Sequence, residues 1–469
     1  MLSFFRVNAL AQFVSLLLLL LLIRLPFLLT PPPLLIPELN WLLVGEQINR
    51  GNLLYRDIWD SLSPLSGIVY WLMNMAFGRS QGALYVAGTV VAAFQVLYFN
   101  YLMNSRDVYP DNTYIPGLLY ALFLNMSFDC STLSPVLLST TFLLLAFGTL
   151  IRQMDRHGAT DEVFEVGFYI SLATLCYLPS ALFIIWAVLS LLLYTGASFR
   201  QHSLTVFGFL FPILLLLLYY YLNDSLEDLN RNLLSSVFRV RQYNLTDFQT
   251  LLASLFLPVA MGTLGFLTLF RQTTRYVNFQ QRVQQIMVLW VLTAFLSIVL
   301  MPFLAPMLFI LFVPAIAFFA GIYFQSFRKM WLAEIIFFGL FASMLVILYQ
   351  GALQLIPRLD LGRLTTLQVK DTAVTRQLQN QKILVIGEDI SAYRQNQVAT
   401  PYLNWDLAKY DLRNLDNYES VISVYDHFRK DPPQYIIDRE NIVEKLFQRA
   451  PALAAAYEKT GTEGVYRRK

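Results

Sequence analysis

Three acidic residues are candidates for chemistry because they lie in one polar segment directly after a long apolar block. The segment covers residues 37–65 and reads PELNWLLVGEQINRGNLLYRDIWDSLSPL. It contains Glu38, Asp57 and Asp60, and the last two would share a face if their stretch were helical, since they are three residues apart. Acidic groups close to a bilayer are costly to desolvate and usually mark a functional site or an ion pair. All three are therefore candidate site residues.

Arginine side chains form a second candidate set. Arg24 lies near the end of the first apolar block, where its side chain can reach the membrane interface, and Arg56 adjoins the acids. Arg231, Arg239 and Arg241 belong to a second long polar segment, residues 223–248. Because arginine pairs with phosphate through two parallel hydrogen bonds, each is a candidate phosphate ligand. Interfacial anchors and salt-bridge partners are the alternative roles for arginines at these places.

A short helix over residues 37–50 would position the first acid. Pro37 suits the first helical turn, Glu38 there is favoured by the helix dipole, and Gly51 suits the C-terminal end. We expect this helix to lie on the membrane surface. A capping role for the Glu38 carboxylate and a solvated or Arg56-paired role for Asp57 and Asp60 are the structural alternatives.

The surrounding sequence is that of a polytopic membrane protein. Of the 469 residues, 57% are hydrophobic and 14% are charged, whereas soluble domains carry roughly 25% charged residues. Apolar blocks recur from residue 11 to about Leu355, and a bilayer-crossing helix needs ~20 apolar residues. The blocks lack the polar faces that helices of a soluble core would show. The predicted spans are 11–29, 83–104, 114–127, 135–151, 166–178, 180–196, 204–222, 249–270, 285–301, 303–324 and 331–355.

The distribution of basic residues sets the orientation of these 11 spans. Short cytoplasmic loops collect Lys and Arg, and the basic clusters at 152–156 and 271–282 fall inside only if the apolar stretch 62–78 does not cross. We therefore expect 62–78 to be a juxtamembrane or re-entrant element of an external loop, 30–82. Such backbone is tolerated at membrane depth only where protein or a water-filled cavity covers it.

A soluble domain follows the last span. We divide the chain into a transmembrane domain, 1–356, and an extracytoplasmic α/β domain, 357–469. Strands are predicted at 382–387, 433–438 and 464–467, and helices at 440–449 and 451–459.

Several motifs together resemble the GT-C superfamily of multi-pass glycosyltransferases, and most closely its protein mannosyltransferase and aminoarabinose transferase branch. Pro37-Glu38 occupies the place of the family's Asp-Glu pair, and Ser63-Pro64-Leu65 that of its Pro-Pro-Leu motif. Phe128-Asp129 with Pro135 is similar to a later Asp-x-Pro element, and the tail ending in 465–468 looks like the family's C-terminal domain.

The resemblance implies transfer of a sugar from a polyprenyl-phosphate donor to an acceptor on the outer face of the membrane. Glu38 would be the general base, Asp57 and Asp60 would assist the acceptor or an ion, and an arginine would hold the phosphate. Asp129 would lie in a short external loop, where substrate binding and plain solvation are both open. Membrane lipid and the lipid-linked sugar are the expected partners.

Other functions remain open. Because the acidic pair is incomplete, a non-catalytic scaffold or accessory subunit of cell-envelope assembly or secretion is the main alternative. A lipid-linked-sugar transporter ranks last, since the centres of the spans hold few ionisable residues. The net charge of +3 does not indicate nucleic acid binding, and Cys130 and Cys176 form no disulfide framework. No residue spacing predicts a metal site, although a divalent ion on Glu38 and Asp57 stays an alternative.

Overall fold

The computed structural model describes residues 1–155, 160–235, 248–271, 276–301, 303–354, 362–370, 378–399 and 401–469. The chain divides into two compact units. The helical unit comprises residues 1–32, 82–217 and 241–366, and the polar unit comprises residues 33–81, 218–240 and 367–469.

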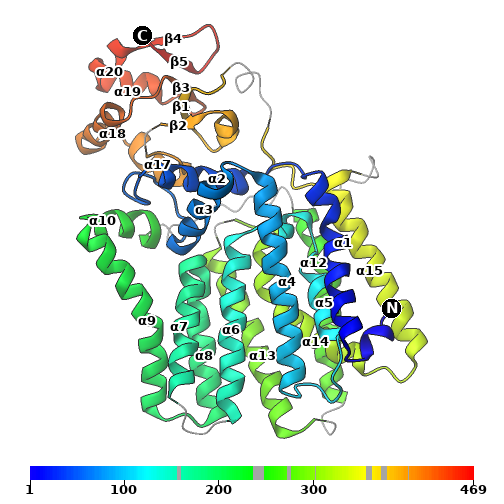
Figure 1. Cartoon of the computed structure of the whole chain (residues 1–469). Helices are drawn as coiled ribbons and strands as arrows, with labels where there is room; N and C mark the ends of the chain where they lie inside the picture. Colours follow the sequence, from blue (N-terminus) through cyan, green and yellow to red (C-terminus); the bar gives the residue numbers. More distant parts are fainter. Residues whose placement is uncertain are drawn as a thin grey trace. The chain divides into compact units, whose positions relative to one another are not determined.

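The helical unit is built from long apolar helices that run alongside one another (Figure 1). α6 packs along α7, and α12 packs along α14. Its α-helices are α1 Leu10–Leu29, α4 Gln81–Ser105, α5 Ile115–Phe123, α6 Pro135–Asp155, α7 Asp161–Cys176, α8 Phe183–Ser190, α9 Phe199–Leu222, α12 Phe248–Arg271, α13 Asn278–Ser297, α14 Val313–Gln325 and α15 Met330–Leu353. Its shorter elements include the 3₁₀ helices η2 Phe128–Ser131, η3 Leu178–Leu182, η7 Ile298–Leu300 and η8 Pro306–Phe312, and the π-helical turn η4 Leu191–Thr195.

Nine helical segments within the described ranges are long and apolar enough to cross a bilayer. The prediction of a polytopic helical membrane protein is confirmed. The count of 11 spans is not, because α5 has 9 residues and α7 has 16, and these are the two segments that were also short in the sequence. The ambiguous stretch 62–78 forms α3, Pro64–Phe77, a 14-residue helix that is not one of the nine candidate spans.

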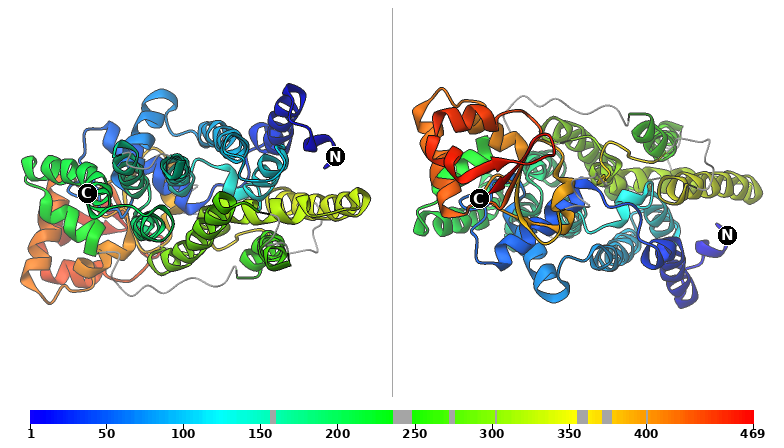
Figure 2. Two further views of the ribbon diagram at one scale, coloured as in Figure 1. Left: turned by 90° about the horizontal axis from the view of Figure 1, so that it is seen from below. Right: turned by 90° about the horizontal axis from the view of Figure 1, so that it is seen from above.

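The polar unit contains a five-stranded sheet with the order β2-β1-β3-β5-β4. β1 runs parallel to β2 and β3, whereas β5 is antiparallel to β3 and β4. Helices accompany this sheet (Figure 2, orange and red). The elements are α2 Ile36–Asn49, α3, α10 Leu226–Leu229, η5 Asn230–Leu234, β1 Lys382–Ile386, η9 Ile390–Gln395, β2 Gln397–Val398, α17 Trp405–Leu412, α18 Tyr418–Lys430, β3 Tyr435–Asp438, α19 Val443–Arg449, α20 Pro451–Ala456, β4 Tyr457–Lys459 and β5 Val465–Arg468.

The segment between the first two long helices belongs to the same unit as the tail. The backbone N–H of Ile36 donates to the carbonyl of Leu367 at 2.7 Å, and that of Trp59 donates to the carbonyl of Pro401 at 2.7 Å. The Trp59 ring lies in the hydrophobic core of the tail domain, with Leu384 and Phe428. The tail therefore builds part of its core from a segment far away in the sequence. The division at residues 356 and 357 stays a prediction about membrane topology.

The predicted elements of the tail are largely present. The predicted runs at 382–387 and 433–438 contain β1 and β3, and the run at 464–467 overlaps β5, which extends one residue further. The prediction of a helix over 451–459 is wrong for its last three residues, because Tyr457–Lys459 pairs with β5 as the edge strand β4.

Candidate functional site

Glu38 is fully buried at the start of α2. Its Oε2 atom accepts a hydrogen bond from the Leu35 backbone N–H and one from Gln81 Nε2, both at 3.1 Å. Pro37 stands in the first turn and Gly51 just beyond the helix with φ +88°, as the sequence predicts. The Glu38 carboxylate therefore satisfies a backbone donor at its own helix end.

Asp60 is also buried, in a stretch without regular secondary structure before α3. Its carboxylate accepts from Asn40 Nδ2 at 2.8 Å and from the Leu62 backbone N–H at 2.7 Å. Burial raises the pKa of Asp60, and these hydrogen bonds oppose that shift.

Asp57 has a different environment from Asp60. Residues 54–60 are not helical, so the condition under which Asp57 and Asp60 would share a helical face is not met. Asp57 Oδ2 accepts from Arg56 Nη2 at 2.9 Å, and Oδ1 accepts from Lys430 Nζ at 2.8 Å. Burial acts to raise the pKa of Asp57, but the hydrogen bonds from Arg56, Lys430 and the Leu53 N–H outweigh it and lower the pKa to about 2. Asp57 is thus ionised at physiological pH.

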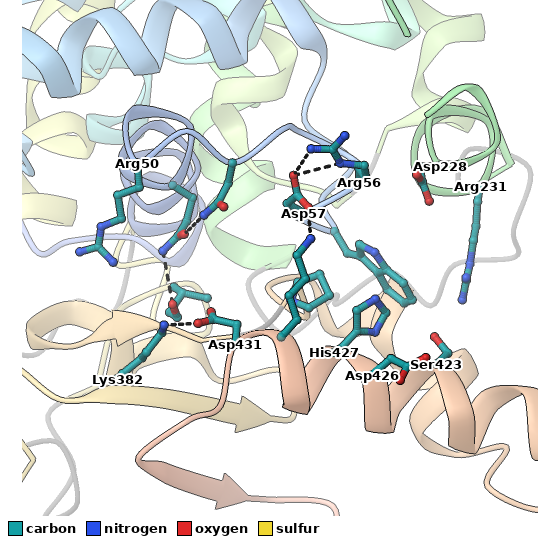
Figure 3. A pocket seen from close by; sticks show the side chains of 16 residues that line it. Arg50, Arg56, Asp57, Asp228, Arg231, Lys382, Ser423, Asp426, His427 and Asp431 are labelled. Carbon is teal, nitrogen blue, oxygen red and sulfur yellow. Dashed lines mark hydrogen bonds and ion pairs between the residues drawn. The ribbon is translucent and has the colours of Figure 1, made fainter. Parts of the chain in front are cut away.

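Arg56 and Asp57 line an open cavity of about 670 Å³ within the polar unit. Figure 3 shows this cavity with charged side chains on both sides. Its walls come from five chain segments, and a volume of 300–1,000 Å³ is usual for small-molecule sites. The lining residues are Gln47, Arg50, Asn52, Arg56, Asp57, Trp59, Asp228, Arg231, Lys382, Val398, Pro401, Ser423, Asp426, His427, Lys430 and Asp431.

Aromatic rings and an arginine form the centre of this cavity. The Arg231 guanidinium lies 4.3 Å from the Trp59 ring centroid and pairs with Asp411 at 2.6 Å. His427 Nδ1 lies 2.8 Å from the Tyr402 hydroxyl, and both rings meet Trp59 edge-on. Burial lowers the pKa of His427, with Lys430 and Arg231 acting in the same direction and Asp411 against it. The lowered pKa therefore favours the neutral form of this histidine.

Sequence reasoning did not find the cavity. It grouped Arg231 with the external arginines and assigned no role to His427 or Lys430. The signal that was missing is the pairing of Lys430 with Asp57 across 373 residues of sequence.

The predicted interfacial position of Arg24 is wrong. The side chain is buried in the helical unit. Nε donates to Asn125 Oδ1 at 2.8 Å, and Nη1 and Nη2 donate to the carbonyls of Ser131 and Cys130, each at 3.2 Å. Arg24 therefore clamps the turn around η2.

Of the two roles left open for Asp129, plain solvation is excluded by burial, and substrate binding stays a prediction. Asp129 is fully buried in η2, where Oδ2 accepts from the Met307 backbone N–H at 2.8 Å. Burial raises its pKa to about 6, against its hydrogen bonds from Ser127 and Met307. Asp129 caps the start of η8, which leads into α14.

The remaining candidates cannot be placed in the same way. Arg239 and Arg241 lie outside the described residues. Within the described ranges, no three His, Cys, Asp or Glu side chains gather closely enough to hold a metal ion.

Comparison with solved structures identifies the class of fold. ArnT from Cupriavidus metallidurans, in a crystal structure with undecaprenyl phosphate, is 14% identical with a TM-score of 0.52, and the match covers 73% of this chain and 64% of that one. An oligosaccharyltransferase from Archaeoglobus fulgidus with a tethered acceptor peptide is 11% identical with a TM-score of 0.50, over 90% of this chain and 68% of that one. The fold is that of the GT-C membrane glycosyltransferases.

The chain belongs to the family of unknown function DUF6427, whose model matches residues 61–356. No curated protein matches the sequence. The chain spans about two thirds of the length of ArnT.

Proposed function

We propose that this protein is a GT-C-type glycosyltransferase that uses a polyprenyl-phosphate sugar as donor. The observation that carries the proposal is the fold shared with ArnT, whose structure holds undecaprenyl phosphate. The acceptor would be glycosylated on the non-cytoplasmic face, where we place the polar unit.

In this reaction an acceptor hydroxyl attacks the anomeric carbon of the donor sugar. The bond from that carbon to the phosphate oxygen breaks, polyprenyl phosphate leaves, and the hydroxyl proton passes to a base. Among Glu38, Asp57 and Asp60, the geometry favours Asp57 for contact with the acceptor, because its carboxylate lines the open cavity. Glu38 and Asp60 are buried and hold their own segment, so we assign them positioning roles.

A second function is favoured by a specific observation. A general base works best with a pKa near the operating pH, whereas Arg56 and Lys430 help to hold the pKa of Asp57 at about 2. A weak proton acceptor of this kind fits a non-catalytic protein that binds the lipid carrier and serves cell-envelope assembly or secretion.

Reconstitution distinguishes the two functions. The full chain in proteoliposomes would receive radiolabelled polyprenyl-phosphate sugars, and transfer to a membrane extract from the native host would be measured beside binding of undecaprenyl phosphate. We expect Asp57→Asn to reduce transfer about 100-fold, within the usual 10²–10⁴ of a removed acid–base group, while carrier binding is kept. Glu419→Gln, an exposed carboxylate of α18 that lies outside the cavity lining, is the control for charge.

Carrier binding without transfer by the unmodified protein would favour the non-catalytic function. Full transfer by Asp57→Asn would show that Asp57 is not the general base. Glu38 would then be the candidate for that role, and Glu38→Gln would test it.

The orientation can be tested by cysteine labelling. Both native cysteines are buried. A cysteine introduced at Asn52, or at the exposed Glu463, would therefore be the residue that reacts with the label. We expect a membrane-impermeant maleimide to label both from outside in intact cells, and labelling only after lysis would contradict the proposed topology.

A further inference from the structure

The charged cavity of the polar unit has a lining that indicates its ligand. We propose that it binds a saccharide of a few sugar units that is neutral or nearly so, and that this saccharide is the acceptor. The acceptor role rests on the proposed function, whereas saccharide binding does not.

The charge of the lining excludes most other ligands. Cationic and acidic side chains nearly balance: Arg50, Arg56, Arg231, Lys382 and Lys430 against Asp57, Asp228, Asp426 and Asp431. A multiply phosphorylated ligand or an acidic peptide would meet carboxylates on both sides of the cavity (Figure 3). A purely apolar ligand would desolvate the charged side chains of the lining without giving them partners, since only Trp59, Val398 and Pro401 among the lining residues are apolar.

A polyhydroxylated ligand fits a wall of this kind. Each sugar hydroxyl donates one hydrogen bond and accepts others, so it needs donors and acceptors close together. Asp228, from α10, stands near Arg231 and Arg56, and Asp426 and Ser423 stand on the facing helix α18 (Figure 3). Within the described residues no hydrogen bond engages the Asp426 carboxylate. This carboxylate can accept from a ligand hydroxyl without breaking an existing bond.

The donors of the cavity are held in place before a ligand arrives. Arg231 is held by the Asp411 ion pair and the Trp59 ring, and Arg56 and Lys430 each pair with Asp57. An arginine has five N–H donors, so the pairing of Arg231 Nη2 with Asp411 leaves donors for a ligand. Fixed polar groups lower the entropic cost of binding a flexible saccharide. The same lining places the Asp57 carboxylate beside a bound acceptor.

Binding can be measured without donor or catalysis. The full chain in detergent micelles would be titrated with mannotriose, maltotriose and N,N′,N″-triacetylchitotriose by saturation-transfer NMR and calorimetry. Inorganic pyrophosphate and a hexa-aspartate peptide serve as anionic probes. We expect at least one trisaccharide to bind with a Kd in the micromolar to millimolar range, with no competition from either anion.

Two variants on one helix locate the binding. Asp426→Asn exchanges an exposed carboxylate of the cavity, and Glu419→Gln exchanges an exposed carboxylate of α18 outside the lining. We expect Asp426→Asn to weaken binding about tenfold, as for a lost hydrogen bond to a charged group. Glu419→Gln should leave binding unchanged. Because Asp426 is exposed, the folded state should tolerate its exchange.

Three outcomes would overturn the inference: no trisaccharide binds at 10 mM (about 100 times a Kd of 0.1 mM), pyrophosphate displaces the saccharide, or Asp426→Asn and Glu419→Gln bind equally. Failure of the proposed function looks different. Saccharide binding without any sugar transfer would support the saccharide site and contradict the acceptor role. Sugar transfer without saccharide binding would contradict the saccharide site and leave the proposed function standing.

Discussion

The helical unit and the polar unit each hold an arginine and an aspartate that the sequence marks as candidates: Arg24 and Asp129 in the first, Arg56 and Asp57 in the second. The two pairs differ in burial and in bonding partners. Arg24 and Asp129 are buried and bonded to backbone or amide groups of their own unit. Arg56 and Asp57 pair with each other and line an open cavity. In the sequence, both pairs are simply charged residues near apolar blocks. Only their bonding partners in the fold distinguish a structural role from a position in an open cavity.

The sharpest test of this contrast is Arg24→Met. The change removes three hydrogen bonds and leaves the Asn125 oxygen and two carbonyls buried without these donors. We expect a loss of about 3 kcal/mol or more in the free energy of unfolding, measured by denaturant or thermal unfolding in detergent. An unchanged midpoint would mean that Arg24 reaches lipid or phosphate after all. Arg56→Met is the matched control, with little expected effect.

Asp129→Ala should have the next largest effect. It removes the acceptor of the Met307 N–H at the start of η8, and we expect a loss of about 2 kcal/mol. Asp129→Asn keeps an oxygen acceptor and should lose much less. Since burial raises the pKa of Asp129 to about 6, its folded form favours the proton, and stability should fall as pH rises from about 4 through 6. Asp129→Asn should remove this slope, and equal losses in both variants would contradict the capping role.

Lys430→Met tests the polar unit in the same way and should barely change its stability. Lys430 is largely exposed, so loss of its ion pair should cost about 0.5 kcal/mol. The variant should raise the pKa of Asp57 because one of its hydrogen bonds disappears. If Asp57 is the general base, the acidic limb of the pH profile of sugar transfer should therefore shift to higher pH. A large loss of stability with no change in the pH profile would place Lys430 among structural residues instead.

The smallest effect concerns His427. Burial lowers its pKa in the folded state, so the stability it contributes is present above the unfolded value near 6.5 and is lost as pH falls toward the lower folded value. We expect thermal unfolding of the unmodified protein to show a lower midpoint below pH 6. His427→Gln should flatten this slope, while His202→Gln, a helical-unit control, should leave it as it is. If the unfolding midpoint depends on pH equally in His427→Gln and His202→Gln, His427 is not the source of the slope.

The elements that local sequence determines were predictable, and the bonds between distant segments were not. The apolar run Ile383–Ile386 and the Pro37 start of α2 are local signals, and both are present in the structure. The two-residue strand β2 carries no such run, and Tyr457–Lys459 becomes a strand only because β5 lies beside it.

The site residues show the same limit. A buried position for Arg24 requires the turn at residues 125–131 to fold back on α1, which no spacing in the sequence indicates. Asp57 was found as a candidate from its type and segment. Its partner Lys430 and the cavity that both line depend on the tertiary fold, because no period or motif connects residues 57 and 430.

The insertion of Trp59 into the core of the tail domain has a consequence for biosynthesis. During translation, residues 53–60 leave the ribosome hundreds of residues before the strands that bury this indole ring. The Trp59 side chain therefore stays uncovered until the C-terminal strands have been synthesised. Truncation before β3 should leave a nascent chain that recruits folding factors or is degraded, even though its membrane helices are already inserted.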